Sequence, residues 1–180
     1  MPRRSRNSIR PTFGIITAND FYGMLVDDFD EYVKSPRSSC LALHCATSTY
    51  HLYEWVWGDW LKKDPSVQKQ LKINKKDKRA GFCSWLKGPD GCPRFSVIEE
   101  LVNGAKHFSH DQNFTTVPLF SWDTPRAGWG EGAWDLVIDL GGNQMVSASE
   151  LLHEAVQFWF QFLKKYHPTS GLSAPGGSKP

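Results

Sequence analysis

The sequence predicts a mainly α fold: a four-helix bundle with a β-hairpin inserted between the third and fourth helices. Apolar residues recur at helical spacing in four segments of the chain. Residues 115–140 instead combine two strand-like runs with a Gly- and Pro-rich connection, which is typical of a hairpin. A length of 180 residues with 40% hydrophobic composition suits one domain with a sizeable core. We therefore expect a single helical-bundle domain over residues 18–167.

The first two helices are expected over residues 18–36 and 37–61. In the first, Asn19 stands where an N-cap belongs, Pro36 ends the helix, and apolar residues recur at helical spacing at Phe21, Leu25, Phe29 and Tyr32. The second helix carries apolar side chains on nearly every face. It should therefore lie centrally in the bundle.

The third helix is expected over residues 94–108, where the apolar residues fall on one side: Phe95, Ile98, Leu101, Val102, Ala105 and Phe108. Residues 115–121 and 133–140 are predicted to form the two strands of the hairpin, at about 115–140. Ser147 and Glu150 have the spacing of a capping box at the start of a last helix over residues 148–167.

Basic residues are concentrated in two segments. Residues 1–10 carry a charge of +4, and residues 62–79 carry eight Lys or Arg against two Asp, whereas the remaining chain carries −8. We expect a basic N-terminal arm over residues 1–17 and a basic loop, which would meet RNA or another polyanion. A solvated loop and tail is the alternative. The candidate nucleic-acid-binding residues are Lys62, Lys63, Lys75, Lys76, Lys78 and Arg79.

No cofactor or metal is expected. The four cysteines show no Cys-x-x-Cys pairing, and we interpret them as buried core thiols: Cys40, Cys45, Cys83 and Cys92. Two of them with His107 and His110 would give a zinc set, but its eight-residue cysteine gap is unusual. The segment 150–154 copies the Glu-x-x-His of di-iron bundles, which need that motif on two helices.

The expected location is cytoplasmic, without a membrane contact. No apolar run approaches the ~18 residues that a membrane span needs, and the first residues lack the apolar segment of a secretion signal. Residues 168–180 are rich in Gly, Ser and Pro and are expected to be a disordered tail.

A narrow polar row runs along the second predicted helix. At 100° per residue, His51 and Glu54 lie on this row between apolar flanks, together with His44, Thr47 and Gly58. A spacing of three residues lets the Glu54 carboxylate accept a proton from the His51 imidazole and fix its tautomer. The row predicts either a site lined by polar groups or a purely structural pairing.

The third predicted helix carries a second candidate group. Asn103 and His107 lie four residues apart on the side opposite the apolar face, with Lys106 beside them. An imidazole with an amide and a cation nearby is typical of a general acid/base that acts next to a phosphate. Simple solvent exposure is the alternative, because the same side also carries other polar residues.

Two segments carry a resemblance to known proteins. "CATSTYHLYEWVW" (45–57) and "ELVNGAKHF" (100–108) look like a group of small uncharacterised bacterial proteins with TA-x-HL-x-DW and NG-x-KHF segments. These segments cover about an eighth of the chain. The order of the motifs, hairpin and last helix fits that group as well.

More distantly, the third helix resembles the HEPN families. That resemblance implies a dimeric four-helix bundle and, in ribonuclease members, an Arg-x4-6-His motif. His107 matches the motif histidine and Asn103 the asparagine that often follows the arginine, but Val102 stands at the arginine position. Without a guanidinium, a phosphate loses its bidentate partner.

Two functions therefore remain as hypotheses. The first is a non-catalytic or degenerate helical module that associates with nucleic acid or a protein partner, as a homodimer or with another chain. The second is a metal-independent endoribonuclease of a bacterial defence or toxin-type system. In that enzyme His107 would act with Asn103, Lys106, His51 and Glu54.

Overall fold

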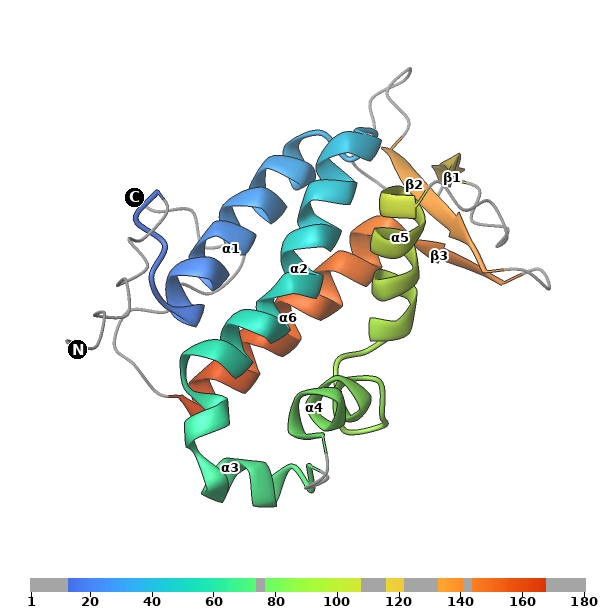
Figure 1. The fold of residues 1–180 in the computed structure, drawn as a ribbon. Coiled ribbons are helices and arrows are strands. Elements are labelled where there is room, and N and C mark those ends of the chain that lie inside the picture. Colours follow the sequence, from blue (N-terminus) through green and yellow to red (C-terminus); the bar gives the residue numbers. More distant parts are fainter. Residues whose placement is uncertain (1–12, 74–76, 108–115, 122–132, 141–143, 168–180) are drawn as a thin grey trace.

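The computed structural model describes residues 13–73, 77–107, 116–121, 133–140 and 144–167 (Figure 1). Most of the predicted basic arm and the predicted tail lie outside this part of the chain, as do Lys75 and Lys76. Among the helices that are described, none combines the length and the apolar character that crossing a membrane requires.

The fold is mainly α, as predicted, and its four longest described helices surround one core. They are α1 (Ala18–Lys34), α2 (Ser39–Asp59), α5 (Phe95–His107) and α6 (Ala148–Tyr166). The first two lie side by side, α6 packs against both of them, and α5 packs against α2 (Figure 1). The central position that the apolar pattern predicted for the second helix is confirmed.

Polar caps set where the long helices begin. The Thr17 side chain accepts a hydrogen bond from the Asp20 amide, and the Asp20 carboxylate accepts one from the Thr17 amide, which makes a capping box. The predicted cap, Asn19, is already inside α1, so that prediction is wrong by two residues. Ser147 caps α6 through the Glu150 amide, at 3.0 Å, as predicted.

The basic segment 62–79 is not the loop that the sequence suggested. It contains a 3-10 helix (Leu61–Lys63), α3 (Pro65–Gln70) and the start of α4 (Lys78–Leu86). Asp64 and Asp77 cap α3 and α4, and their side chains accept backbone hydrogen bonds there. The charge count concealed these helices because it treated both aspartates only as charges.

The hairpin forms between α5 and α6 as predicted, and a short third strand extends it. β1 (Thr116–Ser121) pairs antiparallel with β2 (Ala133–Asp139), and β2 pairs antiparallel with β3 (Met145–Ser147). Strand β3 has no clear pattern in the sequence, because it is three residues long and runs directly into the Ser147 cap of α6.

Aromatic residues fill much of the core. The largest fully buried side chains include Trp159, Tyr22, Tyr32, Phe82 and Phe95. The cysteines follow the predicted core only in part: Cys45 and Cys92 are buried, Cys83 is half-buried, and Cys40 is exposed. The interpretation of Cys40 as a core residue is wrong, because it lies in the first turn of α2, ahead of the buried part of that helix.

Candidate functional site

The predicted pair on α2 forms. His51 Nδ1 lies 3.3 Å from Glu54 Oε2, one helical turn apart. Both side chains remain open to solvent, with 44% of His51 and 37% of Glu54 exposed. A carboxylate that accepts from Nδ1 selects the tautomer in which Nε2 carries a lone pair. The pair can therefore present a proton acceptor at the surface.

Arg79 in the first turn of α4 completes this group. Its guanidinium forms an ion pair with Glu54 Oε1 and lies 5.9 Å from the centre of the Tyr53 ring. The Tyr53 hydroxyl also donates to Glu54 Oε1, at 3.5 Å. One carboxylate therefore holds an imidazole and a guanidinium on the same exposed face. Folding brings the imidazole and the guanidinium together, because Arg79 is distant from the His51 row in sequence.

Aromatic rings of α2 and α5 pack beside the His51, Glu54 and Arg79 group. Tyr50 stacks on Phe95 of α5 with ring centroids 5.8 Å apart, and its edge meets Tyr53 and His51, each at 5.3 Å. Burial raises the pKa of Tyr50. Its hydroxyl stays protonated at neutral pH.

Helix α4 is held on both sides, which fixes the position of Arg79. Phe82 is fully buried, and Lys87 at its C-terminal end pairs with Glu99 on α5. The following turn packs closely on α4: a Cβ at Gly91 would collide with the carbonyl oxygens of Trp85 and Leu86. Gly91 is therefore required by this close approach.

The candidate lysines that the structure describes are exposed to solvent. Lys62 and Lys63 are exposed in the 3-10 helix, and Lys78 is exposed beside Arg79. Lys63 Nζ donates to the Asp59 carbonyl oxygen at 2.9 Å. Within the described part of the chain, no carboxylate forms an ion pair with Lys62 or Lys78.

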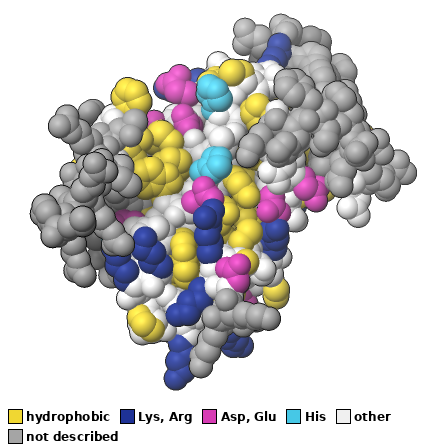
Figure 2. All heavy atoms as spheres, viewed as in Figure 1, with side chains coloured by type: hydrophobic (Ala, Val, Ile, Leu, Met, Phe, Trp, Pro, Cys, Tyr) yellow, Lys and Arg dark blue, Asp and Glu magenta, His cyan; other side chains and the backbone are white. Residues whose placement is uncertain are grey.

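Basic side chains gather on the same face of the molecule as these lysines. Figure 2 shows Lys and Arg side chains gathered over α3 and α4, below histidine and acidic side chains on α2. The segment 62–79 keeps a net positive charge, because its two aspartates, which cap α3 and α4, offset only two of its eight Lys and Arg side chains. This face is therefore suited to an anion.

The second candidate group, on α5, is described only in part. Asn103 is exposed, whereas the side chains of Lys106 and His107 lie outside the described residues. Val102, at the arginine position of the HEPN motif, is buried with 7% exposure. Its side chain belongs to the core, so that position does not present a group to the surface. No described contact joins Asn103 to His51 or Glu54.

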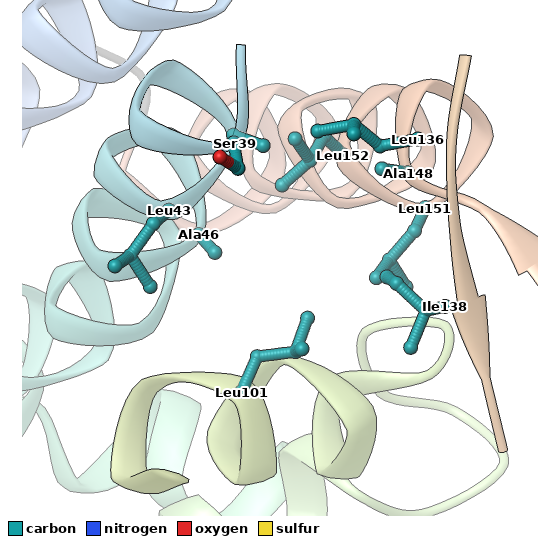
Figure 3. A pocket seen from close by; sticks show the side chains of 10 residues that line it. Ser39, Leu43, Ala46, Leu101, Leu136, Ile138, Ala148, Leu151 and Leu152 are labelled. Carbon is teal, nitrogen blue, oxygen red and sulfur yellow. The ribbon is translucent and has the colours of Figure 1, made fainter. Parts of the chain in front are cut away.

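A separate apolar pocket lies between α2, α5, α6 and β2. It has a volume of about 190 Å³, and its lining is aliphatic apart from Ser39. Figure 3 shows Ala46, Leu101, Ile138 and Leu151 facing this space from four different elements. The pocket contains no titratable side chain, so it offers a cavity for packing rather than a centre for acid/base chemistry.

Arg79 is the residue whose role the sequence did not reveal. It was predicted as one of several basic residues that bind nucleic acid, not as a partner of Glu54. Asp77 is the signal that could have placed it on a helix, because Asp77 caps α4 two positions before Arg79.

Comparison with protein-family models, with curated proteins and with solved structures found no match.

Proposed function

We propose that this protein binds RNA through the face formed by α2 and α4, with Arg79 as the central phosphate contact and His51, in its doubly protonated form, as a second one that donates through Nε2. The observation that carries the proposal is that one carboxylate, Glu54, holds a guanidinium and an imidazole together on a solvent-exposed surface. A guanidinium has five donors in a rigid fork, so Arg79 can bind Glu54 and still donate to a phosphate.

The surrounding lysines support a polyanion rather than a single small anion. Lys62 lies in the 3-10 helix and Lys78 in the first turn of α4, and neither has a described acid partner. Successive phosphates of a strand could meet these cations in turn, each contact releasing counterions. The predicted arm at residues 1–17 would add further cations to the same partner.

We also propose a HEPN-like ancestry. It is supported by four long helices with a hairpin between the third and fourth, together with the resemblance of residues 100–108. That ancestry implies a homodimer, which analytical ultracentrifugation of the full chain tests. In this proposal Arg79 supplies a guanidinium from α4, whereas the HEPN motif supplies it from the helix that carries the motif histidine.

Metal-independent RNA cleavage is the second candidate function. The observation that favours it is the 3.3 Å contact of His51 Nδ1 with Glu54, which leaves Nε2 as a proton acceptor. His51 would take the proton of a ribose 2′-hydroxyl, whose oxygen attacks the adjacent phosphorus. A 2′,3′-cyclic phosphate forms, and the expelled 5′-oxygen takes a proton from water. Arg79 would stabilise the negative charge that develops on the phosphate oxygens.

One electrophoretic experiment tests both functions. The full chain is incubated with a labelled structured RNA pool in EDTA at low salt, and both shift and cleavage are read. We expect a shift that Arg79→Ala weakens, with His44→Ala as a control, since His44 is an exposed histidine two turns away on α2. Absence of any shift in the wild-type protein would contradict the proposal.

Cleavage is assigned in the same experiment. A product that disappears in His51→Ala but persists in His107→Ala would place the chemistry on α2. A product lost only in His107→Ala would place it on α5. RNA binding without a cleavage product would support the non-catalytic module.

A further inference from the structure

A second depression opens beside Glu54, on the side of α2 that faces the start of α1. Its volume is about 380 Å³, and its lining residues are Ile16, Glu54, Trp55, Gly58 and Asp59. The four α2 residues are spaced i, i+1, i+4 and i+5, so they share one helical face. Glu54 lines this depression and also binds His51 and Arg79, so the depression is adjacent to that group.

Trp55 gives the depression a rigid aromatic wall. Phe21 of α1 stacks on the Trp55 ring, with centroids 5.0 Å apart and an interplanar angle of 22°. The indole is half-buried, so it is held in place by α1 and still borders open space. Nucleobases stack on such rings, and this stacking tolerates any base sequence.

Gly58 and Asp59 shape the rest of the depression. A Cβ placed at Gly58 would meet no heavy atom within 4 Å, so the space beside it is open. Asp59 Oδ2 accepts from the Ala18 amide at 3.0 Å. Among the described residues, no other side-chain or amide donor is recorded on this carboxylate. Its second oxygen can accept from an amino group, as carboxylates do from the cytosine N4 amino group.

We propose that this depression binds one nucleobase of single-stranded RNA. The base stacks against Trp55 over the space left by Gly58, and its amino edge donates to Asp59. The adjoining phosphate lies on Arg79. This inference rests on the proposed function and deepens it, because it makes single strands with accessible bases the preferred form of RNA.

The test compares an eight-nucleotide RNA of mixed sequence with an abasic strand of the same length and label, by fluorescence anisotropy of the full chain. We expect the base-containing strand to bind about tenfold more tightly than the abasic strand. Gly58→Leu should reduce that preference to near one, because leucine fills the depression while favouring the helix. Trp55→Ala should act in the same direction.

Gly23→Leu is the matched control. Gly23 is a helical glycine on α1 whose added Cβ would also meet nothing within 4 Å. This variant should keep the tenfold preference. If the wild-type protein binds neither strand, the proposed function fails. If it binds both strands equally, or if Gly58→Leu keeps the preference, RNA binding stands and the base subsite is wrong.

A second comparison tests the contact with Asp59. An oligocytidine should bind more tightly than an oligouridine of equal length, because cytosine offers an amino group where uracil offers a carbonyl oxygen. Asp59→Asn keeps an acceptor for the Ala18 amide and turns a donor toward the base, so the preference should reverse. A preference that is unchanged in Asp59→Asn would overturn this contact.

Discussion

The Arg79 guanidinium on α4 and the Glu54 carboxylate on α2 form an ion pair between residues 25 positions apart in the chain. The same carboxylate holds the His51 ring on its other oxygen. About half of the Arg79 side chain is exposed, so the pair itself contributes little to folding stability. Its consequence is positional: two groups that can contact a phosphate are held on one surface.

Arg79→Ala should weaken RNA binding without unfolding the protein. The slope of log K against log salt should fall by about 0.7, because one phosphate contact with a single strand is lost. The free energy of unfolding should change by less than about 1 kcal/mol. Anisotropy titrations at several salt concentrations and urea unfolding measure the two quantities. Arg79→Lys, which keeps the charge but loses the fork, should fall between wild type and alanine.

Lys62→Ala and Lys78→Ala should each lower the same salt slope by about 0.7, the value for one phosphate of a single strand. The control is Lys34→Ala, because Lys34 is already paired with Glu31 at the end of α1. That variant should leave the slope unchanged. Equal effects of all three substitutions would mean that net charge alone, and not this face, determines binding.

Thr17→Ala should lower the free energy of unfolding by about 1 kcal/mol, because the capping box of α1 loses its hydroxyl. Urea unfolding at neutral pH measures this change. Thr47→Ala is a suitable control, since the Thr47 hydroxyl donates only to the Leu43 carbonyl within α2. An effect of Thr47→Ala as large as that of Thr17→Ala would contradict the assignment of the cap.

Asp20, the acidic residue of the same capping box, predicts that the stability of the protein depends on pH. Hydrogen bonds from the Ile16 amide, the Thr17 hydroxyl and the Thr17 amide lower the pKa of Asp20. Because the folded pKa lies below the unfolded one, the contribution is present at neutral pH and is lost as pH falls below about 4. The stability difference between wild type and Asp20→Asn should therefore shrink in that range, as measured by urea unfolding across pH.

The apolar pocket predicts a stabilising substitution. Ala46→Leu adds carbon atoms to the space of about 190 Å³ and should raise the free energy of unfolding by about 1 kcal/mol. Ala155→Leu is the matched control, because Ala155 is fully buried on α6 but does not line this pocket. That change should destabilise by about 1–3 kcal/mol through overpacking. Thermal unfolding of both variants separates the two cases.

The four cysteines should react with a thiol reagent at different rates, according to their burial. Burial raises the pKa of Cys45 to about 12 and raises that of Cys92 as well. The pKa of the half-buried Cys83 is also raised by burial. A disulfide reagent at pH 8 should therefore react rapidly with the exposed Cys40 and slowly with the others until the protein unfolds. A rapid phase that persists in Cys40→Ser would contradict this order.

The long elements followed from local patterns in the sequence. Apolar spacing predicted all four long helices, and alternation with a Gly-rich connection predicted the hairpin. Short elements did not follow in the same way: α3 spans six residues, and its start depends on the cap that Asp64 provides. A cap of that kind is visible only when an aspartate is considered for its hydrogen bonds as well as its charge.

The candidate site was predictable only within one helix. His51 and Glu54 were paired correctly, because residues three apart on a helix meet regardless of the fold. Arg79 could not be added, because its approach depends on how α4 packs against α2. Val102 shows the converse: the motif position was readable in the sequence, but its burial depends on the packing of α5 into the core.

The most direct test of the RNA-binding face is a nuclear magnetic resonance titration of the full chain with a short single-stranded RNA. The side-chain signals of Arg79 and His51 report on the two proposed phosphate contacts. We predict that both shift with a common saturation curve, and that the side-chain signal of Lys34 stays in place. Saturable RNA binding that leaves the Arg79 and His51 signals unchanged would contradict the account.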